Sequence, residues 1–222
     1  MKHIVIDLEM NKLSQNYKNE REICRCEVIQ IGAVLLDDKY QEIGSFNTLV
    51  KPQYNEQIDK KIEKLTGITT EMVQSAPVFE DALTQFLSWC HSIGDDIQIY
   101  QWSDSDYEQL TKELALKHLS LDEEDFALLQ KFQDFQKEYG ETLGLSKSVS
   151  LKDAIMYAGV DFSGKQHDAL DDAKNTAALL RIVRIPELCM EALENVIKAL
   201  SPKPIGTTLG DLFHFDMLNL PA

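Results

Sequence analysis

The sequence has few basic residues, no long apolar run and few cysteines. Its 22 lysines and arginines stand against 37 acidic residues, a net charge of −15 that argues against a protein coating nucleic acid through a basic surface. The apolar runs are all shorter than a membrane span, and the first residues lack the apolar stretch and cleavage site of a signal peptide. We therefore expect no membrane partner and a cytoplasmic location.

The cysteines give only a weak signal of a metal site. None of the four cysteines forms a Cys-x-x-Cys pair, and the close pair Cys24 and Cys26 has no nearby histidine. Free thiols in a reducing compartment are the favoured interpretation. The acidic charge does not exclude a nuclease, because a site that works through bound cations must itself be a cluster of carboxylates.

What is present is typical of an α/β domain. The 222 residues, of which 44% are hydrophobic, are enough to bury a substantial core. Strands are predicted at residues 4–9, 27–36 and 45–50, with connections too short for crossover helices, so we expect an antiparallel meander of three strands. Further strands at 97–102 and within 126–143 alternate with helices. The sequence therefore predicts a mixed sheet, antiparallel and parallel, flanked by helices.

The remaining elements follow from caps and periodicity. A polar excursion at 11–25 is expected near the mouth of any site, and 120–125 is expected to be an acidic loop. Helices are predicted at 56–65, 78–93, 104–117, 150–159, 168–184 and 186–200. We expect a main domain at 1–185, followed by a helix and an apolar tail at 186–222 that pack on the domain or on a partner.

The first chemical signal is the pair Asp7 and Glu9 in the first strand. Residues two apart in a strand share a face, so these carboxylates point away from the apolar positions 4, 6 and 8. Two adjacent carboxylates repel each other unless a cation lies between them. An isolated Asp-x-Glu is more often a plain polar strand end, so this pair alone decides nothing.

The second signal is the segment HDALDDA, which begins at His167. It places a histidine just before a helix and carboxylates inside it. Helical periodicity puts Asp171 among polar neighbours and Asp172 beside the packed face next to Ala173. Asp172 is therefore the better ligand candidate, and Asp171 is expected to be solvated.

The third signal, WSDSD, follows a strand and opens a helix. Ser103 or Asp104 could be a helix N-cap, and Asp106 could only stabilise the helix dipole. Taken alone, this segment favours that structural interpretation.

Together the three signals resemble the DEDDh (DnaQ-like) 3′–5′ exonuclease superfamily. The order matches: an Asp-x-Glu strand, a central aspartate after a strand, then His-x-Ala-x-x-Asp-Ala. The similarity covers about residues 2–184 and includes EVIQIGAVLL, FNTLVKP and LTGIT. It implies a ribonuclease H-like fold and a metal-dependent exonuclease.

Within the superfamily, the middle motif is similar to the Gly-x-Trp-Asp form of ERI-type and KapD-like exonucleases. Ser103 stands where glycine is usual and Ser105 where tryptophan is usual. This match makes Asp106, not Asp104, the implied ligand. RNA is the first substrate expected by analogy with that branch, with DNA left open.

The resemblance also implies a mechanism. Two divalent ions, Mg²⁺ or Mn²⁺, would be held by Asp7, Glu9, Asp106 and Asp172, and His167 would deprotonate the attacking water. Single-stranded RNA or DNA 3′ ends would be the partners, and nucleoside 5′-monophosphates the products.

Substrate contacts are the least determined part of the sequence. Met10 could pack against the terminal base, and the turn Leu65-Thr66-Gly67 could approach the terminal nucleotide, since glycine permits close backbone contact. Four lysines around the HDALDDA segment could contact phosphates or simply be solvated: Lys147, Lys152, Lys165 and Lys174.

Other functions compete with this hypothesis. The chain could be a non-catalytic interaction protein that keeps the fold, with residues 209–222 docking on a partner or on a second copy. It could also be a DNA-directed proofreading-type exonuclease. A phosphatase or cyclic-nucleotide hydrolase could use the same metal ligands. All four carboxylates and the histidine are present, which favours an active exonuclease.

Overall fold

The computed structural model describes residues 1–145 and 147–200, so the predicted docking segment at 209–222 lies outside the described residues. A five-stranded sheet has the order β3-β2-β1-β4-β5. Its strands are β1 (Lys2–Lys12), β2 (Cys26–Leu36), β3 (Glu42–Leu49), β4 (Ile97–Gln101) and β5 (Phe132–Asp134). The first three pair antiparallel and β4 and β5 add in parallel, which confirms the predicted mixed sheet.

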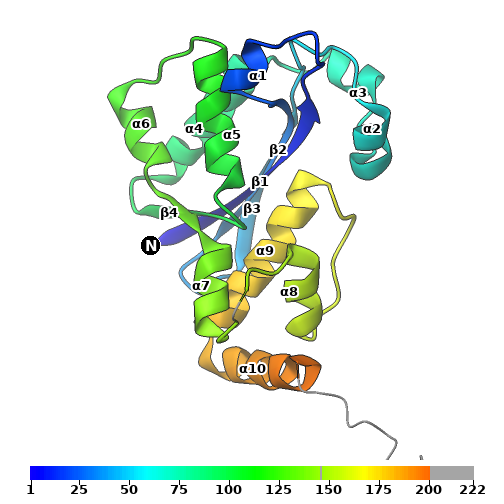
Figure 1. Ribbon diagram of the computed structural model, residues 1–222. Coiled ribbons are helices and arrows are strands. Elements are labelled where there is room, and N and C mark those ends of the chain that lie inside the picture. The colour runs from blue at the N-terminus through cyan, green and yellow to red at the C-terminus, as the bar shows by residue number, and fades with distance from the viewer. Residues whose placement is uncertain (146, 201–222) are drawn as a thin grey trace, which may run out of the picture.

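Helices cover both faces of this sheet (Figure 1). The described helices are α1 (Glu20–Ile23), α2 (Lys60–Thr66), α3 (Thr70–Gln74), α4 (Phe79–Ile93), α5 (Ser105–Leu116), α6 (Glu123–Leu129), α7 (Phe135–Thr142), α8 (Leu151–Tyr157), α9 (Ala169–Arg184) and α10 (Pro186–Leu200). Helices α4, α5 and α6 pack on one face through a core that includes Ile4, Ile6 and Phe86. Helices α7 to α10 pack on the other face.

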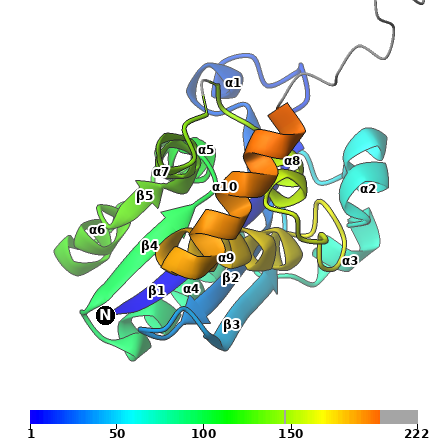
Figure 2. The ribbon, with the colours of Figure 1, turned by 90° about the horizontal axis from the view of Figure 1, so that it is seen from below.

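The second core explains the position of the last helix. Ala192 and Val196 of α10 are buried against α8 and α9, and α10 runs across α9 (Figure 2). The boundary expected at residue 185 stays a prediction. Within the described part of the chain, no helix is long and apolar enough to cross a membrane.

Two segments differ from the sequence-based expectations. The acidic loop expected at 120–125 is partly wrong, because α6 begins inside it: Asp122 accepts the N–H of Asp125, and the acidic first turn complements the helix dipole. The helix expected at 56–65 begins only at Lys60, where Asp59 is the N-cap. A short helix, α3, follows it and was not predicted.

The polar excursion at 11–25 is shorter and more ordered than expected. Strand β1 continues to Lys12, and the helix α1 lies within the segment. The buried Asn11 donates to the backbone oxygen of Gln57 and accepts the N–H of Asp59, which ties β1 to the approach of α2. All four cysteines are free, as expected.

Candidate active site

Strand β1 presents its two carboxylates on one face. The apolar residues Ile4, Ile6 and Leu8 enter the core under α4, whereas Asp7 and Glu9 point to the face covered by α9. The pairing of β1 with β2 shifts register between Glu9 and Met10, so the regular alternation ends directly after the pair. The predicted arrangement of these strand residues is confirmed.

A glycine on the neighbouring strand lets α9 approach this face. Gly32 of β2 lies opposite Asp7. A Cβ at this position would lie 2.2 Å from the backbone nitrogen of Leu170, so any side chain there would push α9 away. Because Gly32 leaves that space, the first turn of α9 rests on the sheet and brings Asp172 toward Asp7 and Glu9. This role of Gly32 was not predicted from the sequence, although close packing is a standard reason for a glycine inside a strand.

Polar contacts fix the start of α9. Asp168 is the N-cap, and its side chain accepts the N–H groups of Leu170 and Asp171. Gln30 of β2 donates to Asp168 Oδ2 at 3.3 Å and accepts the N–H of Ala169 at 3.1 Å. Gln30 lies opposite Glu9 in the sheet, so the strand that carries the acid pair also sets the helix register. This glutamine was not singled out in the sequence.

The middle motif contributes one buried aspartate. Asp106, in the first turn of α5, is only 4% exposed, and its Oδ1 accepts the N–H of Leu8 at 3.2 Å. Asp104 occupies the N-cap position but is exposed and makes no capping bond with its side chain. Gln101 of β4 accepts the N–H of Tyr107 instead, at 2.7 Å. Of the two aspartates, the structure therefore turns Asp106 toward β1.

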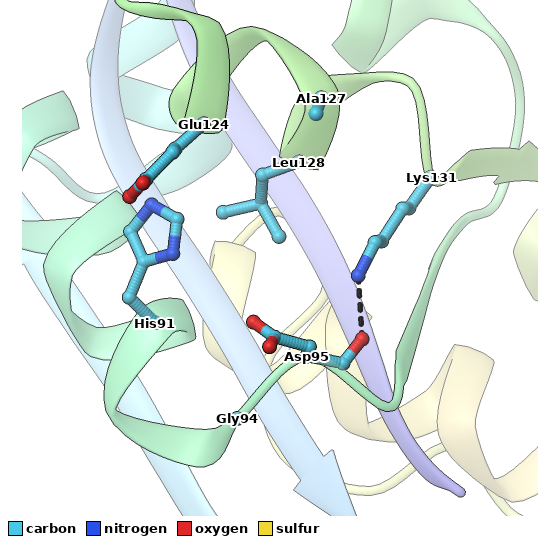
Figure 3. A pocket seen from close by; sticks show the side chains of 7 residues that line it. All are labelled: His91, Gly94, Asp95, Glu124, Ala127, Leu128 and Lys131. Carbon is cyan, nitrogen blue, oxygen red and sulfur yellow. Dashed lines mark hydrogen bonds between the residues drawn. The ribbon is translucent and has the colours of Figure 1, made fainter.

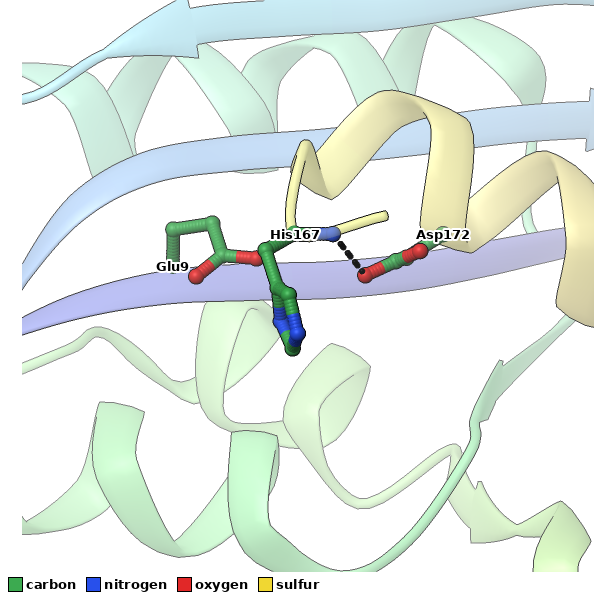
Figure 4. Close-up of side chains that lie close together, drawn as sticks. All are labelled: Glu9, His167 and Asp172. Carbon is green, nitrogen blue, oxygen red and sulfur yellow. Dashed lines mark hydrogen bonds between the residues drawn. The ribbon is translucent and has the colours of Figure 1, made fainter. Parts of the chain in front are cut away.

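The histidine approaches from the loop between α8 and α9. His167 has a left-handed backbone conformation with φ of 63°, which is uncommon for a residue other than glycine. Its N–H donates to Asp172 Oδ2 at 3.0 Å. Ligand atoms of Glu9, His167 and Asp172 all lie within 4.8 Å of one another (Figure 4). The structure thus brings together three of the five predicted site residues as one tight group.

Asp7 and Asp106 belong to the same cluster of charges as this group. Burial, with the charges of Asp106, Asp172 and Glu9, raises the pKa of Asp7 well above its usual value. Because Asp7 is half-buried between strand and helix, its carboxylate has little access to solvent.

The other carboxylates show the same tendency. Burial and the neighbouring acids raise the pKa of Glu9 to about 8, while the charge of Lys165 opposes the rise. Burial raises the pKa of Asp106 to about 7 and that of Asp172 to about 6. Burial lowers the pKa of His167, so its imidazole is neutral near pH 7. In this group of four carboxyls and one neutral imidazole, the ionised form of each carboxyl is therefore disfavoured unless cations bind.

Asp171 differs from its expected solvated position. Its Oδ2 accepts the N–H of Lys165 at 2.8 Å, and the side chain is half-buried. The following polar residue Asn175 is 2% exposed. The polar side of α9 is covered because the loop before His167 folds back onto it. Periodicity assigned the correct aspartate to the acid group but could not foresee that loop.

The predicted substrate residues are divided between two places. Met10 is half-buried and packs against the core under the opposite face, so its contact with a base stays a prediction. Leu65 is exposed, Thr66 is buried, and Gly67 ends α2 with φ of 75°. Thr66 and Gly67 line a hollow of about 380 Å³ together with Lys165 and residues of β2 and β3.

Another hollow lies far from the acid group. It has a volume of about 530 Å³ and lies between the end of α4 and α6 (Figure 3). Lys131 closes one side by donating to the backbone oxygen of Asp95 at 2.6 Å, and His91 pairs with Asp125 at 2.7 Å. Asp96 bonds to the first residues of β1, so this hollow is near the strand end opposite to Asp7 and Glu9.

Residues 4–180 match the RNase T family model, whose description is "Exonuclease". Mouse ERI1 exoribonuclease 2 is 26% identical over 93% of this chain and 32% of its own length. Rat 3′-5′ exoribonuclease 1 is 30% identical over 69% of the chain and 45% of its own length. The PolC-type DNA polymerase III of Thermotoga maritima is 29% identical over 82% of the chain and 13% of its own length. The chain spans less than half of each of these relatives.

Solved structures agree with this assignment. The nuclease domain of 3′hExo, a DEDDh family member bound to rAMP, superposes with a TM-score of 0.69 and 25% identity, covering 81% of this chain and 90% of that domain. E. coli Exonuclease I in complex with a dA16 oligonucleotide shares the fold, with a TM-score of 0.61 and 17% identity over 85% of this chain and 42% of that protein. The chain therefore belongs to the RNase T-type, DEDDh exonuclease family, whose members are hydrolases of phosphodiester bonds that depend on divalent metal ions.

Proposed function

We propose that this protein removes nucleoside 5′-monophosphates from the 3′ ends of single-stranded RNA, and less readily of DNA, by hydrolysis with two divalent metal ions. The observation that carries the proposal is the convergence of Glu9, His167 and Asp172, within 4.8 Å, beside the half-buried Asp7 and the buried Asp106. These five residues come from three distant segments. Nothing in the packing of a sheet requires so many acids in one place.

The residues fit Mg²⁺ or Mn²⁺. Asp7, Glu9, Asp106 and Asp172 offer carboxylate oxygens, the ligands that these hard cations prefer. Their pKa values are raised by burial and mutual repulsion, so bound positive charge would stabilise the ionised forms. Bound divalent ions would polarise the phosphate and lower the pKa of the attacking water.

His167 is the group assigned to move the proton. A neutral imidazole beside the acids can accept a proton from water as the water oxygen attacks the terminal phosphorus. The bond between that phosphorus and the 3′ oxygen of the penultimate nucleotide breaks. The 3′ oxygen takes up a proton and remains on the shortened strand, and the terminal nucleotide leaves as its 5′-monophosphate.

The choice of RNA rests on the relatives. Several of them are named exoribonucleases, and one solved neighbour holds rAMP. A polymerase relative and the Exonuclease I complex with DNA are the reason to test both sugars.

The test uses 5′-labelled single-stranded RNA and DNA oligonucleotides with Mg²⁺ or Mn²⁺. We expect a ladder that shortens from the 3′ end, faster on RNA, and no ladder with EDTA. Asp106→Asn should abolish it. Asp104→Asn is the matched control, because it removes the same charge from the same helix end at an exposed position and should leave the rate unchanged. Internal cleavage, or full activity of Asp106→Asn, would contradict the proposal.

A further inference from the structure

Lys165 connects the histidine loop to a distant turn. It lies two residues before His167, and its ammonium donates to the backbone oxygen of Thr66 at 2.7 Å. Thr66 ends α2 and is 99 positions away in sequence. The lysine thus spans the hollow beside Gly67, with its backbone on the α9 side and its charge on the α2 side.

Three other hydrogen bonds of this loop connect it to α9. Asn175 accepts the N–H of Ser163 at 2.9 Å and donates to its backbone oxygen at 2.8 Å. Asp171 accepts the N–H of Lys165, and Gly164 leaves room for that carboxylate, since a Cβ there would lie 2.3 Å from it. These bonds hold the backbone of the loop against α9. On the side of the loop away from α9, the Lys165 side chain makes the contact with Thr66.

The turn at the end of α2 is shaped to receive the ammonium. Gly67 has φ of 75°, and a Cβ at this position would lie 2.1 Å from Lys165 Nζ. Glycine is therefore favoured at this point by its backbone conformation, and it also leaves the space that the lysine ammonium occupies. The lysine and the glycine form one unit, although they belong to different motifs in the sequence.

We propose that Lys165 is a positioning residue for the hydrolysis: its bond to the Thr66 carbonyl holds the loop so that the His167 imidazole stays beside Glu9 and Asp172. This inference rests on the proposed function. Because His167 has an uncommon backbone conformation, its loop needs support from both sides to keep one geometry. A small displacement of a catalytic base is enough to slow the chemical step strongly.

The first test compares single variants in the exonuclease assay. Lys165→Met keeps most of the side-chain volume and removes the donor; we expect kcat to fall at least tenfold while KM stays within about twofold. Lys165→Arg can still donate to the carbonyl and should recover kcat to within about threefold of the natural protein. Lys39→Met is the matched control, since it changes the net charge equally at an exposed turn and should have no effect.

The second test probes the unit formed by the two residues. Gly67→Ala should lower kcat by a factor similar to Lys165→Met, because its methyl group displaces the ammonium. The double variant should be little slower than either single variant, since both remove one bond. Thermal melting of each variant checks that the fold persists.

The outcomes separate this inference from the function it rests on. If the natural protein shortens no strand, the proposed function fails. If it is active and Lys165→Met keeps its kcat, or raises only KM as a phosphate contact would, the positioning role is wrong. Independent, multiplying losses in the double variant would also overturn it.

Discussion

Buried carboxylates occur in two regions of this protein, and their surroundings differ. Glu27 and Glu113 are fully buried with Lys117, whose ammonium lies 3.2 Å from Glu27 Oε1 and 2.8 Å from Glu113 Oε1. Glu27 also accepts the N–H groups of residues 53, 54 and 55. Burial raises the pKa of Glu113, but Lys117 and the N–H of Val28 oppose the rise. Here the chain itself supplies the compensating charge.

The acid group of the active site has few such partners. The N–H of Leu8 reaches Asp106 and the N–H of His167 reaches Asp172, while the dominant neighbours of Asp7 are other carboxylates. An uncompensated buried charge is costly, whereas a compensated one is tolerated. Glu27 and Glu113 thus have their compensating charge within the fold, whereas the acids around Asp7 have none in the chain that matches their number.

The largest effect should follow from removing one active-site carboxylate. Asp7→Asn should lower exonuclease activity by at least about a thousandfold, or ~4 kcal/mol of activation free energy. Its stability without metal should not fall, because the change relieves repulsion among carboxylates. Kinetics and urea unfolding in EDTA measure the two quantities. Strong destabilisation would show that Asp7 is a structural residue like Glu27.

The converse change should affect the other region. Lys117→Met leaves Glu27 and Glu113 buried without their cation, and we expect the free energy of unfolding to drop by about 3 kcal/mol. The change also removes the ammonium that lies 5.1 Å from the centroid of the Phe79 ring. Urea denaturation gives the loss, and kcat of the folded fraction should be unchanged. If Lys117→Met is as stable as the natural protein, Lys117 does not compensate Glu27 and Glu113, and the two regions do not differ in this respect.

A third change tests what brings the acids together. In Gly32→Ala, the new methyl group would meet the backbone of α9 at Ala169 and Leu170, so the helix must move outward. We expect a loss of about 2 kcal/mol in stability, as for overpacking, and a tenfold or greater loss in kcat. Ala33→Gly, on the next position of the same strand, is the control for strand stability. Unchanged kcat in Gly32→Ala would mean that α9 does not set the distance between Asp172 and β1.

Gly32 also shows where sequence reasoning reached its limit. Local signals predicted most of the fold: α8 begins where the helix at 150–159 was predicted, with Ser150 as its N-cap, and α10 has the predicted bounds. Hydrophobic alternation placed Asp7 and Glu9 on one face. Each local sequence pattern, however, predicts only one helix or strand. The packing of Gly32 against a helix more than a hundred residues away could therefore not be predicted from such a pattern.

The same reason explains the other differences at the site. Helical periodicity separated Asp172 from Asp171, but the loop that covers Asp171 is held by long-range contacts, such as that between Lys165 and Thr66. Gln30 looks like an ordinary strand residue until α9 starts above it. What the sequence could supply was the identity of the chemical groups. Their support depends on tertiary packing that no motif encodes.

The smallest effect concerns pH without metal. Raised pKa values mean that the folded protein keeps protons on Glu9, Asp106 and Asp172 at pH values where the unfolded chain has lost them. Their contribution to stability is therefore greatest at low pH and is lost as the pH rises toward 8. Because other groups also titrate, the informative quantity is a difference between two proteins. In EDTA, Asp7→Asn should melt a few degrees above the natural protein at pH 8, and the gap should narrow at pH 5.

Added Mg²⁺ should reverse that gap at pH 8, since only the natural protein keeps the full set of acids that binds cations, and binding to the folded state raises the melting temperature. Differential scanning calorimetry at both pH values provides the four comparisons. For the acids around Lys117 we expect no change of melting temperature with Mg²⁺, because their compensating charge is already in the chain. If the difference in melting temperature between the two proteins does not change with pH or Mg²⁺, the acids around Asp7 are structural residues like those around Lys117.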